Sequence, residues 1–124
     1  MKKVLLVEDE KEIRELYAQY LGDMGYTVIS AEDGNVALQK AFSEEWDIML
    51  LDVILPGQDG IQVLKLIKAD KLLRDKPVIA LTNLNIESVI NEIFDLGADG
   101  FLVKSEITPD KIFNEIETVL QKYS

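Results

Sequence analysis

Five short apolar runs, separated by segments with helical spacing, constrain the fold of this chain more than any other feature. The runs cover residues 4–7, 27–31, 48–51, 77–81 and 100–103. A run that is largely apolar, without alternation, is typical of a strand that is covered by protein on both faces. We therefore expect five strands, each buried in the middle of the molecule.

The segments between the runs repeat apolar residues every three or four positions, as amphipathic helices do. They span residues 13–24, 37–42, 61–67, 89–94 and 112–120. Gly25 and Gly97 follow two of these segments, where a left-handed helix end favours glycine. Thr108 and Pro109 offer a capping hydroxyl and a first-turn proline for the last helix. Five strands alternating with five helices predict an α/β domain with a doubly wound parallel sheet.

Composition narrows the chemistry that such a domain can perform. The 124 residues include no Cys and no His, so disulfides, thiolate nucleophiles, catalytic triads and His-ligated metals are excluded. Carboxylates, Lys and hydroxyls remain, and these suit hard cations and phosphate. The net charge of −10 argues against direct nucleic-acid binding. We find no signal peptide and no apolar run long enough for membrane insertion, so we expect a cytoplasmic protein.

Polar side chains gather where the predicted strands end. In a doubly wound sheet, ligands bind outside the carboxyl ends of the strands. The residues at these ends are Glu8, Asp9, Ser30, Asp52, Thr82 and Lys104. They form a set suited to a phosphate and a divalent cation.

Four motifs, in this order along the chain, resemble the receiver domains of two-component signalling. They are VLLVEDE, DIMLLDVILPGQDG, PVIALT and GADGFLVK. The resemblance implies a flavodoxin-like sheet with the strand order 2-1-3-4-5, as in chemotaxis regulators. It also implies one receiver domain over residues 1–124, and we expect no effector domain in this chain.

By this resemblance, Asp52 is the phosphoacceptor and Mg²⁺ is the cofactor, with Mn²⁺ as a possible substitute. Asp9 and Asp52 would bind the metal directly, Glu8 would act through water, and the backbone carbonyl of Ile54 would complete the set. Asp9 also suits the N-cap of the first helix, since Glu12 follows three residues later in a capping box.

The resemblance also assigns roles at the ends of the last two strands. Lys104 would pair with the phosphate, and Thr82 would donate its hydroxyl to a phosphoryl oxygen. Thr82 and Phe101 would form the conformational switch. The output would then appear on the face made by the fourth helix, the fifth strand and the fifth helix.

Three departures from the family pattern bear on the chemistry. Ser105 follows Lys104 where the family usually has Pro, often after a cis peptide, so we expect a trans peptide and a changed aim of Lys104. Asn83 replaces a small residue and narrows access to Asp52. Ile54 and Leu84 are apolar at positions that tune hydrolysis, which predicts a long-lived phosphoryl group.

The expected partners follow from this assignment. A histidine kinase or a histidine phosphotransfer protein would donate the phosphoryl group, docking near Ile13 and Arg14 and on the loop after Lys104. A downstream protein target would receive the signal. We expect a monomer or a weak dimer.

Three alternative functions agree less well with the sequence. A phosphorylation-independent receiver-like binding module keeps the same fold without the chemistry. A phosphohydrolase with an Asp nucleophile needs a second acid two residues later, where this chain has Ile54. Flavin phosphate would be repelled by the acidic strand ends. We therefore predict a phosphoacceptor and no turnover enzyme.

Overall fold

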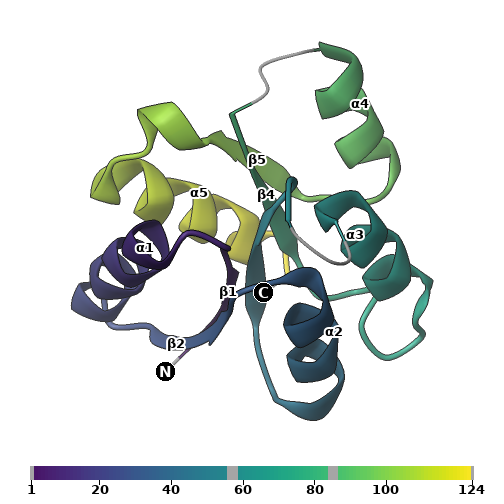
Figure 1. Cartoon of the computed structure of the whole chain (residues 1–124), viewed down its shortest axis with the longest axis horizontal. Helices are drawn as coiled ribbons and strands as arrows, with labels where there is room; N and C mark the ends of the chain where they lie inside the picture. Colours follow the sequence, from purple (N-terminus) through teal and green to yellow (C-terminus); the bar gives the residue numbers. More distant parts are fainter. Residues whose placement is uncertain (1, 56–58, 84–86, 124) are drawn as a thin grey trace.

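A five-stranded parallel sheet, in the order β2-β1-β3-β4-β5, organises the molecule (Figure 1). The computed structural model of the protein describes residues 2–55, 59–83 and 87–123. The strands are β1 (Lys3–Val7), β2 (Thr27–Ala31), β3 (Ile48–Asp52), β4 (Val78–Thr82) and β5 (Gly100–Val103). The predicted flavodoxin-like architecture and strand order are confirmed, and the predicted fourth strand is displaced by one residue.

Helices cover both faces of this sheet. They are α1 (Lys11–Asp23), α2 (Gly34–Ser43), α3 (Gly60–Ala69), α4 (Glu87–Asp95) and α5 (Pro109–Gln121), and a short 3₁₀ turn, η1 (Lys104–Glu106), follows β5. Figure 1 shows α1 and α5 on one side of the sheet, and α2, α3 and α4 on the other. Within the described ranges, no helix is both long and apolar enough to cross a membrane.

Two hydrophobic cores lie on the two faces of the sheet, and alternate residues of each central strand enter them. In β1, Leu5 and Val7 pack in the core under α2, α3 and α4, whereas Val4 and Leu6 pack in the core under α1 and α5. All four are fully buried. Because both faces are covered, polar side chains of the central strands are confined to the strand ends.

The helix ends agree with the sequence in part. Gly25 and Gly97 have φ angles of 95° and 106°, the left-handed conformation predicted for them. Thr108 is the N-cap of α5 and Pro109 occupies its first turn, but the Thr108 hydroxyl donates to the Asp110 carboxylate and caps no backbone N–H.

The prediction that Asp9 caps α1 is wrong. Glu10 is the N-cap, and its carbonyl accepts the first helical hydrogen bond, from Arg14 N at 2.8 Å. The capping box of Asp9 and Glu12 does not form, because the chain makes one more residue of turn before the helix begins. Asp9 therefore lies outside the helix, beside the end of β1.

Gly60 fixes the connection from β3 to α3 by a close approach of two backbones. Its N–H donates to the carbonyl of Val53 at 2.9 Å. A Cβ atom at this position would lie 2.1 Å from the carbonyl oxygen of Asp52 and 2.6 Å from Cα of Val53. Only glycine allows α3 to begin so close to the end of β3.

We predict that Gly60→Ala destabilises the protein by about 3 kcal/mol, because the new methyl group collides with backbone that cannot rotate away. The matched control is Gly22→Ala in α1, where a Cβ atom would meet nothing within 4 Å. This control should gain about 0.5–1 kcal/mol from the higher helix propensity of Ala. Urea unfolding measures both free energies, and equal effects of the two substitutions would contradict the close approach.

Candidate functional site at the carboxyl ends of the strands

Three carboxylates converge at the carboxyl edge of the sheet. Glu8 follows β1 and is fully buried, Asp52 ends β3 with 3% of its surface exposed, and Asp9 is exposed. One carboxylate oxygen from each lies within 4.8 Å of the others. Such crowding is unfavourable unless positive charge is nearby, since two unit charges about 4 Å apart repel by ~4 kcal/mol at an effective dielectric of 20.

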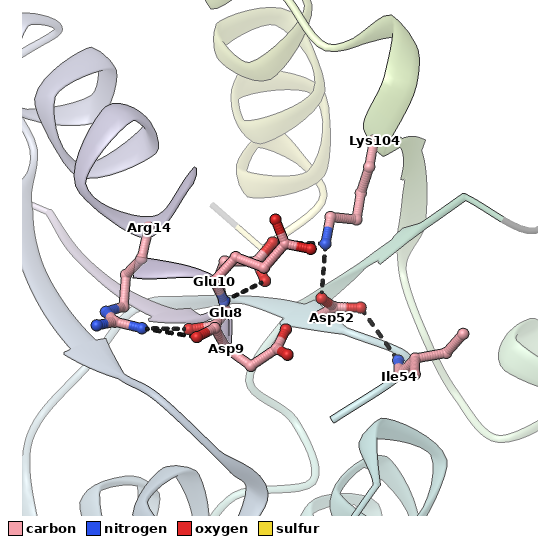
Figure 2. A network of polar contacts seen from close by, with 7 residues as sticks. All are labelled: Glu8, Asp9, Glu10, Arg14, Asp52, Ile54 and Lys104. Carbon is pink, nitrogen blue, oxygen red and sulfur yellow. Dashed lines mark hydrogen bonds and ion pairs between the residues drawn. The ribbon is translucent and has the colours of Figure 1, made fainter. Parts of the chain in front are cut away.

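Lys104 supplies positive charge to this cluster. Its ammonium nitrogen lies 2.8 Å from Oδ2 of Asp52 and 2.6 Å from Oε1 of Glu8. Figure 2 shows Lys104 reaching down from the chain after β5, with Glu8 and Asp52 on either side of its tip. The other oxygen of Asp52, Oδ1, accepts a hydrogen bond from the N–H of Ile54 at 3.0 Å. Both oxygens of the predicted acceptor are thereby oriented.

The buried oxygen Oε1 of Glu8 meets a cation but no hydrogen-bond donor in good geometry. The close contact with Lys104 is an ion pair, and among the described residues this oxygen has no hydrogen-bond partner. Because the Lys104 ammonium lies 2.6 Å from this oxygen, a bound dication would share it with Lys104. With oxygens of Asp9 and Asp52 close by, the donor set matches the carboxylate ligands that Mg²⁺ takes in proteins. The residues present thus fit a magnesium ion.

The electrostatics of the cluster shift two pKa values. Burial by itself lowers the pKa of Lys104, but its hydrogen bond to Asp52 and its contact with Glu8 outweigh burial and raise that pKa overall. Desolvation, reinforced by the neighbouring Glu8 carboxylate, raises the pKa of Asp9. Lys104 consequently stays an ammonium. A cation bound beside Asp9 would stabilise its ionised carboxylate by offsetting the negative charge of Glu8.

A small cleft of about 190 Å³ opens above this cluster. Its lining residues are Asp9, Glu10, Asp52, Ile54, Thr82, Asn83 and Lys104. A larger cleft of about 450 Å³ lies at the opposite edge of the sheet, around Lys2, Asp47 and Tyr123. The smaller one holds the converging charged groups, and we therefore take it as the functional site.

The arrangement also includes a residue whose role the sequence did not suggest. Arg14 of α1, near which we predict that the donor protein docks, donates from its guanidinium to the carbonyl oxygens of Glu8 and Asp9 (Figure 2). A side chain that binds backbone five or six residues earlier leaves no periodic signal in the sequence. The one available signal is that Arg14 lies close in the sequence to two acids at the end of a predicted strand.

Comparison with known proteins agrees with this geometry. Residues 4–117 match the response regulator receiver domain family. The chain belongs to that family.

Several characterised proteins are similar over nearly the whole chain. It is 34% identical over 122 residues to the transcriptional regulatory protein ResD of Bacillus subtilis, covering 98% of this chain and 49% of ResD. It is 35% identical over 124 residues to the phosphate regulon regulatory protein PhoB of Escherichia coli, covering 99% of this chain and 53% of PhoB. The chain thus spans about half the length of these curated relatives.

Solved structures show the same fold. The chemotaxis protein CheY4 of Vibrio cholerae superimposes with a TM-score of 0.90 and 32% identity, over 96% of this chain and 98% of CheY4. A CheY-like receiver domain protein from Methanospirillum hungatei gives a TM-score of 0.89 at 27% identity, covering 98% and 95% of the two chains. The family is a signalling domain and not a turnover enzyme.

In this receiver domain, the replacement of Pro by Ser105 does not turn Lys104 away from the site. Every peptide bond in the described ranges is trans, including the one between Lys104 and Ser105. Lys104 begins the 3₁₀ turn η1, one residue after β5 ends at Val103. The expected change in its aim does not occur, since its ammonium reaches both Asp52 and Glu8.

The remaining predicted residues lie around the receiver site at different depths. Thr82 ends β4 and is buried in the wall of the cleft, whereas Asn83 is exposed at its rim. Leu84 lies outside the described residues. Phe101 is half-buried on β5, away from the cleft, and its ring meets that of Phe94 in α4 edge-to-face at 5.9 Å.

We predict that Lys104→Met lowers the free energy of unfolding by about 3 kcal/mol without metal, because buried carboxylates lose their counter-charge. Added Mg²⁺ should stabilise this variant more than the parent, since the ion no longer competes with an ammonium. Thermal unfolding with EDTA and with Mg²⁺ measures both effects. Lys65→Met, at an exposed position of α3, is the control. Equal losses in the two variants would show that the Lys104 contacts add no stability.

Proposed function

We propose that the chain is a phosphoacceptor of a His-to-Asp phosphorelay, phosphorylated on Asp52 in an Mg²⁺-dependent reaction. One observation supports this most strongly. The Asp52 carboxylate lies at a cleft, held by Lys104 and Ile54 N–H, with oxygens of Glu8 and Asp9 close by. Receiver domains bind Mg²⁺ in such an acidic pocket.

The proposed reaction needs no general base. An oxygen of the ionised Asp52 carboxylate attacks the phosphorus of a phosphohistidine, the P–N bond breaks, and the donor imidazole leaves with the bonding electron pair. Alignment and charge compensation provide most of the catalysis in phosphoryl transfer. Lys104 neutralises charge on the phosphoryl oxygens, and bound Mg²⁺, held by Asp9, Asp52, Glu8 through water and the Ile54 carbonyl, would supply the remaining positive charge.

The signal would travel from the site to the face formed by α4, β5 and α5. Thr82 would move toward the phosphoryl oxygens, and Phe101 would follow into the vacated space. The edge-to-face contact of Phe101 with Phe94 supports this route, because it links the switch residue directly to α4. Full conversion from 1:99 to 99:1 requires about 5.5 kcal/mol of differential stabilisation.

The partners are proposed on the same basis. A histidine kinase or histidine phosphotransfer protein would act as donor, and a protein target would bind the output face. ResD and PhoB are named as transcriptional regulatory proteins. With a net charge of −10, residues 1–124 would pass the signal on by protein contact and not bind DNA themselves.

The first test of this proposal is the intact mass after incubation with acetyl phosphate and Mg²⁺. We predict the gain of one phosphoryl group by the parent, with Mn²⁺ able to replace Mg²⁺, and no gain by Asp52→Ala. Asp59→Ala is the control, since Asp59 is an exposed helix cap outside the site. A folded parent that gains no mass would instead support the phosphorylation-independent binding module.

We also predict a long-lived phosphoryl group, because the exposed side chain of Ile54 leaves a water at the cleft without a polar partner there. Ile54 is 61% exposed and lines the cleft. Ile54→Asn should shorten the lifetime about tenfold, the effect of ~1.4 kcal/mol on the barrier. Leu72→Asn, at an apolar residue 85% exposed outside the cleft, is the matched control. Loss of the label from the parent within seconds would oppose this prediction.

A further inference from the structure

The Arg14 guanidinium binds the backbone of the turn that holds two of the three acids. Its Nη1 atom donates to the carbonyl oxygen of Glu8 at 2.8 Å and, at a longer 3.4 Å, to that of Asp9. Figure 2 shows the side chain folded from α1 back over this turn. Arg14 thereby ties the helix to the backbone directly beneath the acid cluster.

Other contacts hold Glu8 more firmly than Asp9, since the Lys104 ammonium lies 2.6 Å from Oε1 of Glu8. The N-cap residue of α1, Glu10, makes no side-chain capping bond. Glu8 N–H donates to the carbonyl of Ala31 at 3.1 Å, which continues the β1–β2 pairing, and Glu10 N–H donates to Glu8 Oε2 at 3.2 Å. The Asp9 carbonyl accepts from Arg14, so the side chain fixes the backbone of the turn itself.

The chemistry of the contact leaves the carboxylates available. An arginine is always charged, and hydrogen bonds from a charged donor are stronger than neutral ones. In the part of the chain that the structure describes, Arg14 forms no ion pair with a carboxylate. Its guanidinium donates to backbone carbonyl oxygens, so it orders the turn without occupying the carboxylate oxygens that a cation would bind.

We propose that Arg14 is a positioning residue for the metal site, holding the carboxylates of Glu8 and Asp9 in the arrangement that binds a divalent cation. Without it, mutual repulsion would let the exposed Asp9 move away from Asp52 and Glu8, and binding would have to reorder the turn. Contacts that orient metal ligands commonly contribute 10–100-fold to metal affinity. This inference rests on the proposed Mg²⁺ site.

The test compares Arg14→Met, Arg14→Lys and Arg74→Met with the parent. Arg74 is exposed in the connection between α3 and β4, at the opposite edge of the sheet, so Arg74→Met makes the same change of charge elsewhere. Isothermal titration calorimetry gives the Mg²⁺ dissociation constant, and circular dichroism checks that each variant is folded. The initial rate of phosphorylation by acetyl phosphate is then measured against Mg²⁺ concentration.

We expect Arg14→Met to weaken Mg²⁺ binding about tenfold and to recover the parent's phosphorylation rate at saturating Mg²⁺. The Mg²⁺ affinity of Arg14→Lys should lie between those of the parent and Arg14→Met, because its ammonium keeps a charged donor on a shorter reach. The sign of the effect is decisive. Loss of a positive charge by itself attracts Mg²⁺, so a purely electrostatic role predicts tighter binding in both Met variants.

Unchanged or tighter Mg²⁺ binding by folded Arg14 variants, with a parent that binds Mg²⁺, would overturn the positioning role alone. A lower plateau rate at saturating Mg²⁺ would also overturn it, because positioning of the metal ligands affects occupancy only. A folded parent that neither binds Mg²⁺ nor accepts a phosphoryl group would overturn the proposed function together with this inference. The two failures are therefore distinguishable.

Discussion

The contact of Lys104 with Glu8 and Asp52 is the interaction on which the rest of the site depends. Two carboxylates that are nearly or fully buried would be strongly destabilising by themselves, and each lies within 2.8 Å of the same ammonium. The charge-assisted contacts with the ammonium offset the cost of burying both carboxylates. Lys104, which follows β5, and Glu8, which follows β1, meet in this contact at the same edge of the sheet.

The parallel sheet makes that convergence possible. All five strands run in one direction, so their carboxyl ends form one edge, and the register places Asp52 opposite Leu81 and Thr82 opposite Val103. Residues far apart in the sequence therefore become neighbours without any special loop. Close backbone approach at Gly60 completes the edge, since it returns α3 immediately beneath Asp52. The geometry of the site is thus a consequence of strand direction and of one glycine.

The sequence predicted most of this arrangement, because buried strands produce continuous apolar runs and their ends stand out as polar residues. It failed where a contact depends on side-chain reach. Asp9 was predicted as an N-cap from spacing, yet the turn is one residue longer and Glu10 takes that place. Lys104 was expected to aim differently without the following Pro, but its flexible stem reaches Asp52 from a trans backbone. The contact of Arg14 with the carbonyl oxygens was not predicted, since such contacts leave no pattern in the sequence.

The net charge of the acid cluster connects the contacts of Lys104 with those of Arg14. Three carboxylates face one ammonium, so the cluster retains an excess of negative charge that a divalent cation would balance. An arginine paired with Glu8 or Asp9 would reduce that excess and occupy a carboxylate oxygen that a cation could bind. Arg14 binds carbonyl oxygens instead, so it orders the acids while their charge persists. Such order without neutralisation suits Mg²⁺, because this ion demands near-ideal octahedral geometry and dehydrates reluctantly, so ligands that are ordered and still charged favour its binding.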